Sequence, residues 1–157
     1  MAMFAIQDIE DAFVTALTPL KTAGTVRTLK TLTRPLDFNN VEEQVKRFPA
    51  LLVTYAESKI QKNEVRGRLN DVFITIHIYA AAKSLKLESD EDARHGTADV
   101  NGVYDIMDQI RSLLHRQTIL TGWQKAFCTG EQPANYKPES KIVIFQAAYV
   151  INATKAT

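Results

Sequence analysis

The sequence has few of the residues that mark a chemical site or a special environment. It holds one cysteine, Cys128, so no disulfide can form within the chain, and a reducing cytosol fits best. The 19 basic and 18 acidic residues leave a formal charge of +1, which is too weak a field to favour nucleic acid or a membrane surface. No stretch approaches the roughly 18 consecutive apolar residues of a membrane helix. We therefore expect a soluble protein that binds neither nucleic acid nor a membrane.

Residues able to carry catalysis or bind a metal are also scarce, and each has a plainer interpretation. His77, His95 and His115 fall on a predicted strand, a loop and a helix end, and no two of them have metal-ligand spacing. The acidic run 88–92 lacks the alternation and the glycine of a calcium loop. Cys128 has no flanking motif and is more simply a small buried hydrophobe. We therefore expect a protein that is not an enzyme and that binds neither a metal nor a cofactor.

Helices are predicted where apolar residues recur at every third or fourth position. Two long helices are expected over residues 6–20 and 99–116, with Tyr104 and Met107 among the core-facing residues of the second. One short helix is expected over 41–47 and ends before the proline that follows it.

Strands are predicted from alternating or β-branched runs, and the loops from charge and turn residues. The four expected strands cover 25–33 at a sheet edge, 50–56, 71–82 and, in the middle of the sheet, 141–151. The three intervening passages are interpreted as a basic hairpin loop over 59–68, a polar and acidic mobile loop over 83–97, and a turn-rich stretch over 117–138.

This element order predicts a single domain over residues 1–157 with an α+β fold. Its expected architecture is a mostly antiparallel four-stranded sheet packed by two long helices. One face of the strand 71–82 is continuously apolar and is expected to meet the helices, whereas the other face is mixed.

Five segments, taken in order, carry a resemblance to a known family. They read IEDAFVTAL, VRTLKTL, VEEQVKRFPALLVTY, FITIHIYAAAKS and GVYDIMDQIRSLLHRQ. In this order they resemble a small family of tail proteins from Mu-like phages and prophages. Residues 47–50, between the short helix and the second strand, and residues 102–104, at the start of the second long helix, match packing motifs of that family rather than catalytic ones.

The resemblance implies a structural virion protein and a tail-terminator-like fold. In size and element order the family is similar to the tail terminators of long-tailed phages, which form a hexameric ring at the head-proximal end of the tail tube. The implied partners are further copies of this chain, tail tube or sheath proteins, and the head-completion protein. The implied locations are the host cytoplasm during assembly and then the tail or neck of the virion.

A ring subunit needs two different surfaces that meet head-to-tail. The candidates are the basic loop, the acidic loop and the mixed face of the third strand, since loops of opposite charge can steer neighbours together. The candidate interface residues are Lys59, Lys62, Arg66, Arg68, Phe73, His77, Tyr79, Glu88, Asp90, Glu91 and Asp92.

Two alternatives remain open from the sequence. The mixed strand face fits either a partner site or a second packed layer. A non-catalytic interaction module of the same fold, unrelated to tail completion, is the main rival to the tail function, because fold does not fix function.

Overall fold

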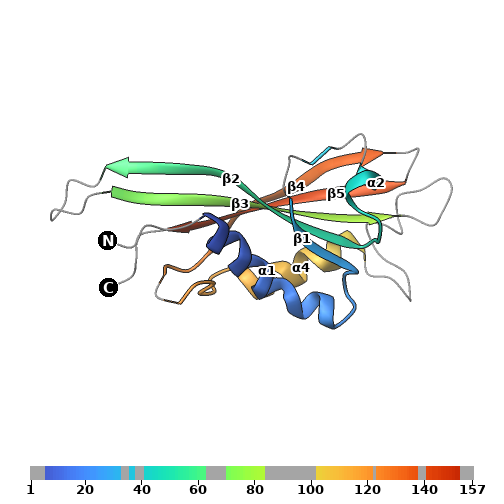
Figure 1. The fold of residues 1–157 in the computed structure, drawn as a ribbon, viewed down its shortest axis with the longest axis horizontal. Helices are drawn as coiled ribbons and strands as arrows, with labels where there is room; N and C mark the ends of the chain where they lie inside the picture. The colour runs from blue at the N-terminus through green and yellow to red at the C-terminus, as the bar shows by residue number, and fades with distance from the viewer. Residues whose placement is uncertain are drawn as a thin grey trace.

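The computed structural model describes residues 6–32, 36–37, 41–62, 70–83, 102–121, 123–137 and 141–152. Its elements form one five-stranded sheet with helices against it (Figure 1). In chain order they are α1 (Ile6–Thr22), β1 (Thr28–Thr31), α2 (Val41–Gln44), β2 (Ala50–Lys62), β3 (Asn70–Lys83), α4 (Val103–Leu114), β4 (Phe127–Lys137) and β5 (Ile142–Asn152). The strand order across the sheet is β1-β2-β3-β5-β4.

The predicted architecture of a four-stranded, mostly antiparallel sheet packed by two long helices is wrong. The sheet has five strands and is mixed, because β1 pairs with β2 in parallel while the other neighbours pair antiparallel. The connection from β1 to β2, residues 32–49, is long enough for parallel pairing, since parallel neighbours need about a dozen residues or more. Among the described helices only α1 is long, with 17 residues, whereas α4 has 12 and α2 has four.

The additional strand is β4, which occupies part of the stretch interpreted as turn-rich. Its sequence includes Gly130 and Pro133, residues that strands generally disfavour. β4 tolerates them because it lies at the edge of the sheet, where a proline breaks no second ladder. Its pairing with β5 also shifts register between Cys128 and Gly130, and again between Pro133 and Asn135. Two bulges and a proline therefore hid an edge strand from pattern analysis.

The main core lies between one face of the sheet and the helices α1 and α4, which share that face (Figure 1). The even residues of β3 from Ile74 to Ala82 are buried there, which confirms the predicted apolar face. Phe13 of α1 packs edge-on against Tyr149 of β5, with ring centroids 6.3 Å apart. Each large side chain buried in this layer contributes about 1.5–3 kcal/mol.

A second, smaller core covers part of the opposite face. Val41 and Val45, from α2 and the residue after it, pack with Leu52 of β2 and Ile144 of β5. The buried Gln44 links this layer to the chain around it, because its Oε1 accepts a hydrogen bond from the Asp37 N–H at 2.8 Å. The short helix α2 thus covers one end of that face of the sheet.

At the other end, β2 and β3 extend together past the two helices (Figure 1). β5 reaches Phe73, which it pairs with Asn152, and beyond this point the described part of the chain adds no third strand. We call residues 59–62 and 70–73 the β2–β3 arm. The basic stretch beginning at Lys59 was predicted to be a loop, but residues 59–62 are paired strand, and residues 63–69 lie outside the described ranges.

Candidate interaction surfaces

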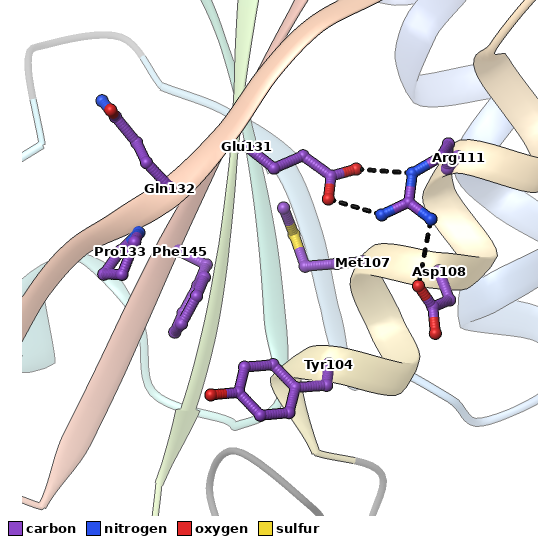
Figure 2. Close-up of a pocket in the computed structure, with 8 residues that line it drawn as sticks. All are labelled: Tyr104, Met107, Asp108, Arg111, Glu131, Gln132, Pro133 and Phe145. Atoms are coloured by element: carbon purple, nitrogen blue, oxygen red, sulfur yellow. Dashed lines mark hydrogen bonds and ion pairs between the residues drawn. The ribbon is translucent and has the colours of Figure 1, made fainter.

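A pocket of about 280 Å³ lies between α4 and β4 (Figure 2). The side chains that line this pocket come from helix α4 and from strands β4 and β5. Tyr104 and Phe145 form one wall, where the two rings meet edge-on with centroids 5.5 Å apart and planes at 88°. Met107 and Pro133 add further apolar surface. Tyr104 was predicted to be a core residue, yet it is 40% exposed at this pocket, so that prediction is wrong.

One wall of the pocket is charged. The Arg111 guanidinium donates from Nε and Nη2 to the two carboxylate oxygens of Glu131, at 2.9 and 2.5 Å, and from Nη1 to Asp108 at 3.1 Å (Figure 2). The paired hydrogen bonds to Glu131 raise the pKa of Arg111 above its ordinary value, so the guanidinium stays charged. Two carboxylates surround this one cation, and the charged groups of the pocket therefore sum to one negative charge.

Beside this ion pair lies the only cysteine, and its surroundings do not favour a nucleophile. His115 uses Nδ1 to accept the backbone N–H of Cys128 at 3.0 Å, so the imidazole binds the main chain rather than the thiol. The thiol is 3.8 Å from both the Gly130 carbonyl and the Glu131 carboxylate. Burial raises the pKa of the Cys128 thiol, which keeps the sulfur protonated and less reactive.

The mixed face of β3 carries three of the predicted interface residues together. Phe73, His77 and Tyr79 are each half-buried on the face opposite α1 and α4. The rings of His77 and Tyr79 meet edge-on at 6.2 Å, and burial lowers the pKa of His77. Tyr79 packs against the second core, so the second-layer interpretation holds at that end of the strand.

The other predicted interface residues are distributed differently. Lys59 is exposed on β2 and forms a 3.7 Å ion pair with Glu57. Lys62 is the last residue of that strand. The remaining charged candidates lie outside the described residues, so the complementarity of the two loops stays a prediction; these are Arg66, Arg68, Glu88, Asp90, Glu91 and Asp92.

Sequence analysis missed Ile60 and the pocket. Ile60 is 66% exposed and is the most exposed large hydrophobic side chain of the described residues. It was overlooked because it stands among lysines and polar residues, and because a bulge between Tyr55 and Glu57 shifts the alternation of β2 ahead of it. The pocket has no sequence signal, because β4 itself was not predicted.

These surfaces define a small α+β protein with a projecting strand pair, an apolar pocket and a partly uncovered sheet face. Within the described ranges, no three potential metal ligands cluster, and no helix is long and apolar enough to cross a membrane. The family model described as "Bacteriophage Mu, Gp37" matches residues 5–132, and the chain belongs to that family. It is therefore a phage protein with a structural, tail-related role. No curated protein matches the chain.

Proposed function

We propose that this chain is a tail terminator, which forms a ring at the head-proximal end of the tail tube and joins the tube to the head. The observation that carries the proposal is the presence of unlike surfaces on one subunit, a projecting strand pair that exposes Ile60 and an apolar pocket elsewhere. Unlike surfaces favour head-to-tail contacts, and such contacts generate a ring when their rotation closes. The family's resemblance to known tail terminators suggests six copies.

The proposed partners follow from this position in the virion. One side of the ring contacts the tube or sheath proteins, and the other contacts the head-completion protein. The uncovered end of the mixed sheet face, with Phe73 and His77, offers half-apolar surface for one of these contacts. The role is structural and uses no catalysis, cofactor or nucleic acid. Subunits assemble in the host cytoplasm and remain in the tail or neck.

The test removes the gene from the phage or prophage that carries it. Electron microscopy of the lysate should then show heads and tails that have not joined. The tail tubes should be irregular in length, because their head-proximal ends are not closed. Supplying the protein from a plasmid should restore joined particles. Normal particles in the absence of the gene product would overturn the proposal.

Light scattering on the purified protein gives an independent measurement. If the measured mass increases with protein concentration and reaches that of six chains, the result would support the ring. Weak contacts between subunits become stronger when each subunit also binds the tube. A second series therefore adds purified tail tubes, and electron microscopy then shows whether a ring forms at the tube end.

A further inference from the structure

We infer that the pocket between α4 and β4 binds a lysine side chain of another protein of the particle. The ammonium group lies at the charged wall of the pocket, formed by Asp108, Arg111 and Glu131, and the methylene stem lies along the aromatic wall, formed by Tyr104 and Phe145. The inference goes beyond the proposed function, because it concerns the chemistry of one contact and applies to any structural role of this chain.

The pocket combines apolar and charged surface, which is the pattern of a site for an amphipathic side chain. Met107 is only 4% exposed and Phe145 is half-buried, whereas Asp108 and Arg111 are exposed. Figure 2 shows the carboxylates of Asp108 and Glu131 beside Arg111 and apart from Phe145. Lysine matches this pattern, because its methylene stem packs on apolar surface while its charged end stays in polar surroundings.

The charge of the pocket favours a cation over an apolar or an anionic ligand. Arg111 is one positive charge between two carboxylates, so one negative charge is left over. An apolar ligand would displace water from this charge without replacing its hydration, which costs free energy. An anion would meet two carboxylates of its own sign. A cation instead compensates the negative charge when water leaves the pocket.

The hydrogen bonds already present favour lysine over arginine. Arg111 donates to both oxygens of Glu131, so it occupies the bidentate side of that carboxylate, and it also donates to Oδ1 of Asp108. An ionised carboxylate has about four lone-pair sites, so both acidic groups can still accept single hydrogen bonds. An ammonium group makes such bonds as a compact point charge, whereas a second guanidinium would need a pair of oxygens in fork geometry.

The aromatic wall adds a second attraction for the same ligand. The rings of Tyr104 and Phe145 are 5.5 Å apart between centroids, and Tyr104 is 40% exposed at the pocket. A cation within about 6 Å of an aromatic face is attracted to the ring electrons, and a methylene stem removes apolar ring surface from water. The volume of about 280 Å³ suits one side chain, since sites for whole small molecules measure roughly 300–1,000 Å³.

Three probes with the same four-carbon stem test the preference for a cationic head group. n-Butylammonium, 1-butanol and pentanoate are titrated separately into the whole protein, and backbone amide resonances are followed by NMR. n-Butylammonium should give saturable shifts at residues 104–111, 131 and 132, with a Kd of about 1–10 mM for so small a probe. 1-Butanol should bind about threefold more weakly or less tightly still, because it lacks the ion pair, and pentanoate should bind most weakly. Equal affinity for 1-butanol, tighter binding of pentanoate, or the absence of saturable shifts overturns the inference.

Variants and a second acidic surface show whether the probe binds in the pocket. Asp108→Asn removes an exposed charge at constant size and should weaken n-butylammonium binding about threefold or more. The matched control is Asp105→Asn, which changes an exposed carboxylate of the same helix outside the pocket lining and should leave the affinity unchanged. Thermal melts first verify that both variants fold. Equal effects of the two substitutions overturn the inference, as do equal shifts at Glu42 and Glu43, exposed carboxylates on α2.

Carbodiimide coupling identifies the lysine in assembled particles of the phage or prophage that carries the gene. The reagent activates a carboxylate, and a lysine amine in contact with it displaces the activating group, so an amide bond forms and a urea carries away the carboxyl oxygen. Mass spectrometry of the digest should show Asp108 or Glu131 joined to a lysine of a different protein. Particles that carry Asp108→Asn should lose the linkage at that position. No linkage at these two residues, or linkage only to another copy of this chain, overturns the inference.

The failure of this inference is distinguishable from the failure of the proposed function. The probe titration needs no particle, so its result does not depend on the role of the chain in the tail. If the gene deletion leaves heads and tails joined while n-butylammonium binds as expected, the tail function is wrong and the chemistry of the pocket stands. If the deletion separates heads from tails while the probe does not bind, the tail function stands and the lysine site is wrong.

Discussion

Replacing Tyr149 with phenylalanine should stabilise the protein, which is unusual for a substitution at a fully buried residue. Tyr149 is 0% exposed, and its hydroxyl has no hydrogen-bond partner of ordinary geometry among the described residues, where the weakly bonding Cys128 thiol lies beside it. A buried hydroxyl without a partner costs about 1–3 kcal/mol. Tyr149→Phe removes the hydroxyl and keeps the ring that packs against Phe13. We expect a gain near the lower limit, about 1 kcal/mol, because the polarisable Cys128 sulfur lies nearby.

The assay is thermal and urea unfolding of the wild type and the variant at neutral pH. For a chain of this size, about 1 kcal/mol corresponds to a rise of about 2–4 °C in Tm. The matched control is Tyr55→Phe, which removes a hydroxyl that is bonded to Ser58 Oγ at 2.7 Å and should cost about 0.5–1.5 kcal/mol.

The same residue predicts the response to alkaline pH. Burial, and then the neighbouring Cys128 and Glu131, raise the pKa of Tyr149 above its ordinary value of 10.0. The unfolded chain therefore loses this proton first, so the stability of the wild type should fall as pH rises above about 10. Tyr149→Phe should show a smaller fall. A loss of about 1 kcal/mol or more on this substitution at neutral pH would refute the reasoning, because it would mean that the hydroxyl is bonded.

Three further experiments test other contacts. Glu10 accepts a hydrogen bond from the Tyr55 N–H at 3.2 Å, and burial raises the pKa of its carboxyl group. In urea unfolding, Glu10→Gln should therefore change the stability little, whereas Glu10→Ala should cost about 0.5–1.5 kcal/mol. Equal effects of the two substitutions would contradict this. A double-mutant cycle with Arg111→Ala and Glu131→Ala should give a coupling of about 0.5–1 kcal/mol that shrinks at high salt, and no measurable coupling would contradict this. Burial lowers the pKa of His77 from its ordinary value of 6.5, so the protonated form is disfavoured in the folded state. The stability of the wild type should therefore fall as the pH drops below 6.5. Thermal melts of His77→Gln across the same pH range should lack this dependence.

Much of the fold could be predicted from local sequence patterns. The helical spacing of apolar residues located α1 and α4, and the alternation from Val72 onward gave the buried face of β3. The apolar character of both faces correctly located β5 between two neighbours. These elements are predictable because each buries a regular side of itself, and that regularity is written into consecutive residues.

The candidate surfaces were much less predictable. Phe73, His77 and Tyr79 were found because they alternate along one strand. The acidic loop candidates lie outside the described residues, and the pocket required β4, which the sequence did not indicate. Tyr104 illustrates the reason. A residue on the apolar side of a helix can be buried in the core or can line a pocket, and which of these occurs depends on how completely the facing strand covers it.

The sequence by itself determined that this is an α+β chain with two main helical stripes, and its ordered motifs indicated its phage family. Local periodicity suffices for this, because it depends on residues that are neighbours in the chain. The tertiary structure alone decided that the sheet is mixed and five-stranded, that Glu131 meets Arg111 from 20 residues away, and that Ile60 stands exposed on a projecting strand pair. Those properties depend on which distant segments become neighbours, and only the folded chain brings them together.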